Sequence, residues 1–409
     1  MNNKKIIIGL SVTFLVILIG VAFWFFLTGR KSGPEIDNTS PFGAPGPQVN
    51  SETPFSGPLT SDGFSPPAAA PYSNSSRLNR VSDAPVVGGT IVVVGSTTVI
   101  RYMEKATGHI IDFDVTNGTR RRITNTTIPK ITEALWGDRG MSLVARFSEN
   151  DSIRSVFGFI SSSTASTTSD GSGDLIRREL SVDMRNLSFS PTKKMGFYTL
   201  DSNAGIQGFI TDKNFEKPLL VWSFPTKEWL VDWPNENTIT LTTKAAHAEL
   251  GQTFLLNPQT KKVTNILSSI PGLTTKTSPD GSLALYSTSK EGLTSLSLYD
   301  IKNKTSDNLE IKTLPEKCVW SGVSAIYCAV PQNGLAGEMP DLWYQGAVSF
   351  TDSLWKITLG GDGFEESELT NISTIAQGNI DLIDPLISGD GKILIFTNKI
   401  DSYLWALSI

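Results

Sequence analysis

The two cysteines are the residues whose spacing most directly suggests covalent chemistry. Cys318 and Cys328 occur in the short segment CVWSGVSAIYC. If its turn centres on Val323, a β-hairpin places the two side chains opposite each other. Opposed Cβ atoms lie about 4.5–5.5 Å apart, which is near the reach of a disulfide. The segment predicts either a disulfide or two small apolar residues packed inside a sheet.

A second candidate site is the segment PQNGLAGEMPDLWYQGAVSFTD, residues 331–352. It carries Trp343 and Tyr344, with Glu338 and Asp341 close by. Aromatic side chains offer a large contact area and suit the recognition of sugars or peptides. Loops that project from a rigid scaffold often carry binding function. We therefore expect a ligand or partner site in this loop; the alternative is that the loop folds back and buries its own aromatic residues.

The sequence lacks the motifs of an enzyme active site. No G-x-S-x-G nucleophile motif occurs, and no G-x-G-x-x-G motif leads from a strand into a helix. The two histidines, His109 and His247, have no partner motif, and two cysteines and two histidines leave little for a zinc site. We expect no catalytic residues, no metal site and no cofactor.

The charge pattern argues against nucleic acid as a partner. The 409-residue chain has a net charge of −5 and no long basic stripe. Such a stripe is the electrostatic signature of a protein that binds a phosphate backbone.

Residues 6–28 are predicted to form a transmembrane helix. The run IIIGLSVTFLVILIGVAFWFFL contains no charge, and about 20 apolar residues cross a hydrocarbon core of about 30 Å. The alternative is a cleaved signal peptide, but the run ends in bulky aromatic residues that suit a membrane interface rather than a cleavage site. Residues 32–76 contain no Lys or Arg. We therefore expect residues 1–5 in the cytoplasm and the rest of the chain, after a single membrane pass, outside the cell membrane.

Residues 29–75 are rich in Pro, Ser, Gly and Ala and show no helical or strand period. Such a segment cannot bury enough apolar surface to offset its ordering entropy. We predict a disordered linker with a mean reach of roughly 35–40 Å; the alternative is a Pro-rich docking motif.

The remaining residues, 76–409, contain a repeat. A Ser or Trp, a short turn of Pro, Gly, Asp or Asn, and an alternating apolar strand recur at intervals of 42 to 45 residues, with two longer intervals of 54 and 68. The repeats are anchored at Trp136, Ser190, Trp233, Ser278, Trp320 and Ser388. This period matches a four-stranded propeller blade.

Seven segments match the third strand of a blade: GHIIDFDV, SVFGFIS, IQGFITD, TFLLNP, SLSLYDI, LWKITL and YLWALSI. They predict an all-β, seven-bladed propeller, with six or eight blades as alternatives. The last copy stops after its third strand, while RLNRVSDAPVVGGTI at the front is similar to the fourth-strand passages. We therefore expect the first strand of the domain to complete the last blade, which leaves no open ring edge.

The segment TSPDGSLALYSTSKEGLTSLSLYDIKNKT, residues 277–305, resembles the repeat of TolB-type and WD-like β-propellers. The passage from CVWSGVSAIYCAVPQN to DLWYQGAVSFTDSLWKITL is similar to a group of membrane-anchored propeller proteins of bacteria. These resemblances imply a propeller fold and an envelope location, and they imply nothing about chemistry.

Together these features favour a non-catalytic protein-binding or scaffold module at the cell envelope. Its expected partner is an envelope protein or a cell-surface polysaccharide. The alternatives are a surface receptor for carbohydrate or peptide and an enzyme whose site lies in the central channel.

Overall fold

The computed structural model describes residues 77–149, 152–161, 173–181, 183–361 and 363–409. The predicted transmembrane segment, residues 6–28, and the predicted linker, residues 29–75, lie outside the described residues. Within the described ranges, no helix combines the length and the apolar character needed to span a bilayer.

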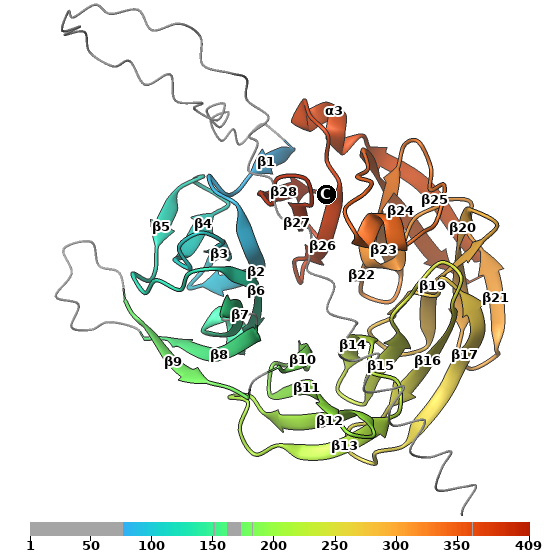
Figure 1. The fold of residues 1–409 in the computed structure, drawn as a ribbon. Helices are drawn as coiled ribbons and strands as arrows, with labels where there is room; N and C mark the ends of the chain where they lie inside the picture. The colour runs from blue at the N-terminus through green and yellow to red at the C-terminus, as the bar shows by residue number, and fades with distance from the viewer. Residues whose placement is uncertain (1–76, 150–151, 162–172, 182, 362) are drawn as a thin grey trace, which may run out of the picture. The chain divides into compact units, whose positions relative to one another are not determined.

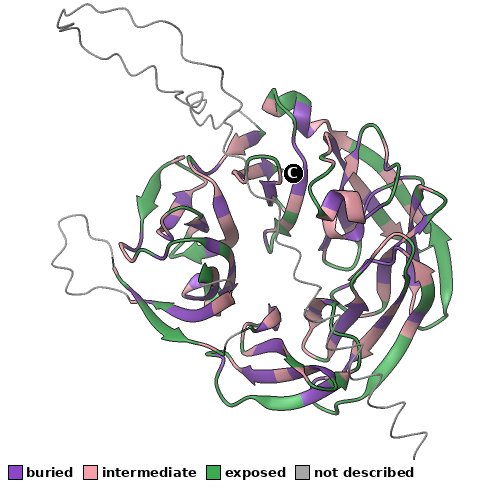
Figure 2. Ribbon diagram, viewed as in Figure 1, coloured by how far each residue is buried: buried purple, intermediate pink, exposed green. Residues whose placement is uncertain are grey.

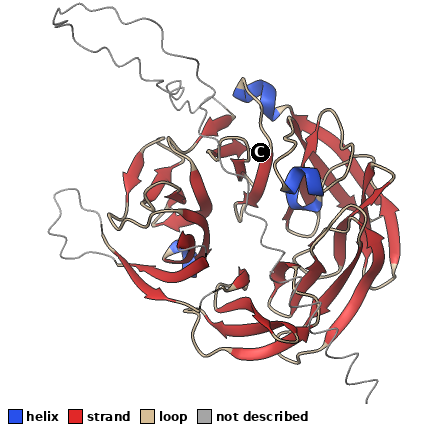
Figure 3. Ribbon diagram, viewed as in Figure 1, coloured by secondary structure: helices blue, strands red, loops and turns tan. Residues whose placement is uncertain are grey.

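The described residues form seven four-stranded antiparallel sheets, arranged in a ring (Figure 1). Strands are the dominant element, and the helical elements are short (Figure 3). The first blade consists of β2 (Val86–Val94), β3 (Thr97–Glu104), β4 (Ile110–Asp114) and β5 (Arg120–Arg122). The second consists of β6 (Ile131–Gly137), β7 (Ser142–Glu149), β8 (Ser152–Ile160) and β9 (Leu175–Glu179). The third consists of β10 (Arg185–Phe189), β11 (Met195–Ser202), β12 (Gly205–Asp212) and β13 (Leu219–Phe224).

The fourth blade consists of β14 (Trp229–Asn235), β15 (Thr238–Thr243), β16 (Leu250–Leu256) and β17 (Val263–Pro271). The fifth consists of β18 (Thr275–Thr277), β19 (Leu283–Lys290), β20 (Leu293–Asp300) and β21 (Thr305–Asn308). The sixth consists of β22 (Cys318–Ser321), β23 (Ala325–Pro331), β24 (Asp352–Gly360) and β25 (Gly363–Thr370). The short helices are η1 (Asp138–Gly140), η2 (Pro315–Lys317), α2 (Asp341–Tyr344) and α3 (Ile372–Ala376).

The seventh blade contains β26 (Leu382–Ile387), β27 (Ile393–Asn398), β28 (Leu404–Ser408) and, as its outer strand, β1 (Leu78–Arg80). Leu78 of β1 lies opposite Leu407 of β28 in antiparallel register. The predicted seven-bladed, all-β architecture is therefore confirmed. Each of the seven segments predicted as third strands lies on the third strand of its blade.

Side-chain hydrogen bonds explain why the SPDG-type turns recur. The Ser278 hydroxyl donates to Asp280 Oδ1 at 2.6 Å and accepts from the backbone N–H of Leu283 at 3.0 Å. The Ser388 hydroxyl donates to Asp390 in the same way, also at 2.6 Å. A Ser and an Asp thus fix the turn between the first and second strands of a blade, and a glycine supplies the positive φ that the turn requires.

The hydrophobic core lies between neighbouring blades. One buried cluster, for example, joins Leu285 of β19 to Ile326 of β23 and Ile357 of β24. The outermost strands are largely exposed, as Figure 2 shows for the rim of the ring. Because packed sheets build the body of the ring, its two faces and its central channel remain for binding.

We call one of these faces the top face. It carries the connections between blades and the loops between the second and third strands of each blade, which include residues 244–249, 291–292, 332–351 and 399–403.

Candidate functional site

The two cysteines form a disulfide at the start of the sixth blade. Cys318 of β22 lies opposite Cys328 of β23, with the Cα atoms 4.1 Å apart and the sulfur atoms 2.13 Å apart. Both residues are buried. The bond ties the innermost strand of this blade to β23, the strand that leads into the loop predicted as a binding site.

The predicted binding loop, residues 331–352, connects β23 to β24 and lies on the top face against several blades. The N–H of Gly337 donates to the carbonyl of Gly292 at 3.1 Å, in the fifth blade. Asp341 accepts a 2.9 Å hydrogen bond from the backbone N–H of His247, in the fourth blade. These contacts hold the loop as a packed part of the top face.

The four predicted loop residues differ in how far they are buried. Trp343 is only 4% exposed, so the loop does fold back and bury this indole side chain. The Tyr344 hydroxyl donates to the Glu316 carboxylate, and Asp341 is half-buried. Glu338 is exposed. Of the four, Glu338 is therefore the side chain that the loop exposes to solvent, whereas Trp343 packs the loop.

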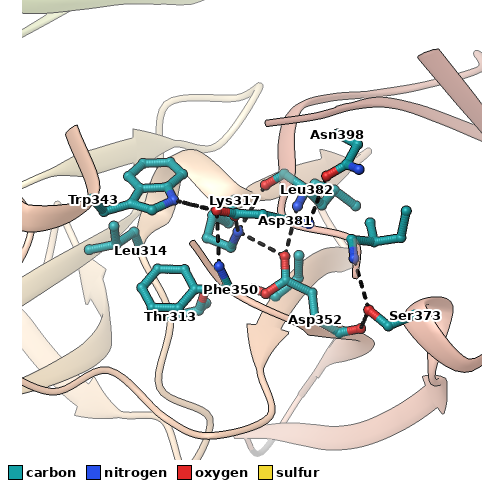
Figure 4. Close-up of polar contacts among 12 residues, drawn as sticks. Thr313, Leu314, Lys317, Trp343, Phe350, Asp352, Ser373, Asp381, Leu382 and Asn398 are labelled. Atoms are coloured by element: carbon teal, nitrogen blue, oxygen red, sulfur yellow. Dashed lines mark hydrogen bonds and ion pairs between the residues drawn. The ribbon is translucent and has the colours of Figure 1, made fainter. Parts of the chain in front are cut away.

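A buried charged cluster fastens the loop to the sixth and seventh blades (Figure 4). Its centre is Lys317, whose Nζ lies 2.8 Å from Asp352 Oδ2 and 2.6 Å from Asp381 Oδ1. The same Nζ donates to the carbonyl of Leu382 at 3.0 Å. All three charged side chains are fully buried. A buried charge is tolerated only when it is paired and hydrogen-bonded, and here the pairing is nearly complete.

Aromatic residues and backbone groups of the loop complete this cluster. Trp343 Nε1 donates to Asp381 Oδ2 at 3.0 Å, and the backbone N–H of Phe350 donates to the same oxygen at 3.1 Å. Lys317 Nζ also lies 5.2 Å from the centroid of the Trp343 ring. A second lysine, Lys399, donates to the Trp343 carbonyl at 2.7 Å. Asp381 thus connects the loop to the seventh blade.

Burial raises the pKa of Asp352 to about 6, although Lys317 opposes the shift. A carboxyl whose pKa is higher in the folded than in the unfolded chain binds its proton more tightly when folded. Its contribution to stability is therefore greatest below the unfolded pKa of 3.8 and is lost as pH rises towards 6.

The variant Asp352→Asn should remove this pH dependence. Between pH 4 and pH 7 we expect the stability of the wild-type protein relative to the variant to fall by up to about 3 kcal/mol, since 2.2 pKa units correspond to about 3 kcal/mol. Urea unfolding of both proteins at each pH measures the difference. A difference that stays constant across this range would contradict the assignment.

A serine–histidine contact lies near the loop and was not anticipated from the sequence. His247 Nδ1 lies 2.9 Å from Ser289 Oγ. Ser289 is buried, and the Asp341 carboxylate contacts the backbone of His247 rather than its ring. A catalytic triad needs an accessible nucleophile and an acid that orients the imidazole. The pair is better explained as a contact that positions the top-face loops.

A pocket of about 420 Å³ lies in the central channel, where the innermost strands begin and therefore towards the top face. Its wall combines apolar residues with five charged side chains: Glu133, Asp232, Lys276, Glu316 and Asp384. We call it the channel pocket. None of these residues was predicted from the sequence to belong to a site.

Most charges of the channel pocket are held by neighbours. Lys276 Nζ lies 3.1 Å from Asp232 Oδ1, and this carboxylate is the main cause of the raised pKa of Lys276. Glu316 accepts hydrogen bonds from Tyr344 and, at 2.8 Å, from Thr274. The Tyr344 contact joins the rim of the pocket to the loop of the sixth blade.

Asp384 is the exception among the acids of the pocket. No hydrogen bond or ion pair joins its carboxylate to another described residue. The side chain is exposed to water, yet the surrounding protein raises its pKa by desolvation; the nearby Glu133 adds to the shift and Lys276 opposes it. Its φ of 51° is left-handed and coincides with an irregularity in the pairing of β26 with β27. Such irregularities redirect side chains next to functional sites.

The pocket does not have the ligand set of a metal centre. Throughout the described ranges, no group of three or more His, Cys, Asp and Glu residues is arranged to hold a metal ion. Its four acids come from different blades and from the segment before the sixth blade.

Comparison with solved structures supports the fold. The chain is similar to oligogalacturonate lyase from Vibrio parahaemolyticus, with a TM-score of 0.52, 8% identity, and coverage of 81% of this chain and 93% of that chain. It is also similar to the tricorn protease, with a TM-score of 0.51, 10% identity and coverage of 83% of this chain. TolB from Acinetobacter baumannii matches with a TM-score of 0.41 and 10% identity, over 78% of this chain and 65% of that chain.

The chain spans 34% of the tricorn protease chain. At these identities the likeness shows the propeller fold alone. No protein-family model matches the sequence. No curated protein matches it either.

Proposed function

We propose that the protein is a non-catalytic binding module, held outside the cell membrane by its N-terminal helix, with the top face of the propeller as its binding surface. The observation that carries the proposal is the position of the channel pocket. It lies towards the face on which the loop of residues 331–352 packs, and Tyr344 links the two. A rigid concave surface with a few placed polar groups is the usual form of a binding site.

The membrane anchor in this proposal rests on the sequence. The uncharged run within residues 6–28 is long enough to cross a bilayer, and the Pro-rich residues 29–75 provide reach away from it. A propeller on such a tether would meet envelope proteins or cell-surface polymers with its top face.

A catalytic role is less well supported than a binding role. The serine–histidine pair formed by Ser289 and His247 lacks an accessible nucleophile, and the channel pocket holds acids without an evident reacting partner. A receptor for a small ligand is the second candidate function, because the pocket has the volume for one.

The proposal can be tested with the full chain in crosslinked cells. Glu338→Arg reverses an exposed charge on the top-face loop, and Glu365→Arg makes the same change on the outer strand β25. We expect mass spectrometry of the captured complexes to show a partner that is lost with Glu338→Arg and kept with Glu365→Arg. Loss with Glu365→Arg alone would place the binding surface on the rim of the ring.

A further inference from the structure

The channel pocket has a charge imbalance that its own residues do not neutralise. Four acids and one lysine line its wall. Arg146 reaches Glu133 at 2.8 Å, and Lys276 is engaged with Asp232. Asp384 forms no ion pair with a described residue, although the more distant Lys276 attracts it, and Asp232 Oδ2 is buried and accepts no hydrogen bond from the described residues. The pocket therefore offers carboxylate oxygens that no described residue pairs.

Most of the remaining wall is apolar and includes Val87, Ala134, Leu230, Val231 and Pro385. Four threonines also line it: Thr240, Thr242, Thr275 and Thr397. A volume of about 420 Å³ lies near the lower end of the range of about 300–1,000 Å³ that small-molecule sites occupy. A largely apolar wall with an unpaired carboxylate is complementary to an apolar stem that ends in a positive charge.

From this geometry we propose that the channel pocket binds a protonated amine or a guanidinium group on an apolar stem, with Asp384 as its counter-ion. The inference rests on the proposed function and deepens it, because it names the chemistry that the top face recognises. The cationic group comes either from a free amine or from a Lys or Arg side chain of a polypeptide. In both cases the stem contacts the apolar wall and the charge reaches Asp384.

The neighbouring charges set the strength of this site. Lys276 repels an incoming cation and competes for Asp232, whereas Glu133 attracts the cation. Because desolvation raises the pKa of Asp384, acidification protonates this carboxyl before ordinary surface acids. Binding of the cation should therefore weaken as pH falls through this raised pKa.

Calorimetric titration of the detergent-solubilised full chain tests the proposal. The probes are n-pentylammonium, its neutral analogue n-pentanol, and the peptides acetyl-Gly-Lys-Gly-amide and acetyl-Gly-norleucine-Gly-amide. We expect each cationic probe to bind about tenfold or more tightly than its neutral analogue, as a charge-assisted hydrogen bond implies. The tighter of the two cationic probes identifies the source of the group. Equal binding of charged and neutral probes would overturn the proposal.

Two variants show whether binding of the cation depends on Asp384 or on the negative charge of the protein surface in general. Asp384→Asn keeps the shape of the side chain, and asparagine tolerates the left-handed backbone there. It should weaken binding of the cation about tenfold or more. Asp307→Asn, on the exposed outer strand β21, removes the same charge and should leave binding unchanged. Equal effects of these two variants would contradict a specific site.

Lys276→Met provides an independent test. If Lys276 only supported the fold, its loss would weaken binding of the cation, whereas the proposal predicts tighter binding. Removal of this cation should tighten binding of pentylammonium, since Asp232 becomes available and repulsion is lost. Weaker binding to a folded Lys276→Met protein would count against the proposal. If the amine does not bind while the partner capture at Glu338 succeeds, this inference fails and the proposed function stands.

Discussion

Replacement of Lys317 with methionine is expected to lower the free energy of unfolding by about 3–5 kcal/mol, because it leaves buried charge without its partner. The side chain of Lys317 is enclosed by Asp352 and Asp381, and all three are inaccessible to solvent. Methionine has a similar length, so the loss comes from electrostatics more than from packing. Urea unfolding of the full chain, followed by tryptophan fluorescence, measures the change.

Two further variants show whether the loss is electrostatic. The triple variant Lys317→Met, Asp352→Asn, Asp381→Asn leaves no unpaired charge and should recover a large part of the stability. Lys290→Met, which breaks an exposed pair with Glu291, should have no measurable effect. The single variant Lys317→Met should also regain stability as pH falls, because protonation removes the buried negative charge. If the free energy of unfolding of Lys317→Met does not rise as pH falls, the cluster acts only by packing.

Deletion of residues 77–82 from the full chain should cost about 3–6 kcal/mol, which is the sum of about 1.5–3 kcal/mol for each of two buried aliphatic side chains. These side chains are Leu78, which packs in the seventh blade, and Val81, which packs against the first blade. The deletion also removes the strand that pairs with β28 and exposes the edge of β28. Denaturant unfolding measures the loss, and hydrogen exchange of β28 locates it.

A deletion of equal length in the predicted linker, residues 70–75, is the matched control. It should leave both the unfolding midpoint and the exchange rates of β28 unchanged. If the two deletions have the same effect, β1 does not contribute to ring stability.

The repeat could be predicted from the sequence because each blade is specified locally. In the fifth blade, Ser278 and Asp280 bond within one turn, and the adjacent strands alternate over a few residues. Cys318 and Cys328 could be placed opposite each other for the same reason, since a short hairpin leaves few registers. Local hydrogen bonds and the two-residue period of strands need no long-range information.

The conformation of the top-face loop could not be predicted in this way. The buried Trp343 donates its indole N–H to Asp381, and Asp381 forms an ion pair with Lys317. These residues come from separate passages of the chain, and no local pattern links them. The sequence does show a lysine, Lys317, next to the first strand of a blade, but it does not show which carboxylates this lysine would pair with.

The channel pocket was missed because its residues occur singly, one in each of several blades. Glu133, Asp232, Lys276 and Asp384 each lie in the first half or at the centre of an innermost strand. Once blades are aligned, a charged residue at this position is a signal, because the innermost strands face the channel. The bulge that carries Asp384 has no comparable signature, although the following Pro385 favours an irregular strand.

The most direct test of the binding role is a photo-crosslinking amino acid placed at residue 338 of the full chain in living cells, with the same substitution at residue 365 as control. Residue 338 lies on the top-face loop and residue 365 on the outer strand β25. We predict an adduct of discrete mass from position 338 and none from position 365. An adduct from position 365 alone would contradict a binding surface on the top face.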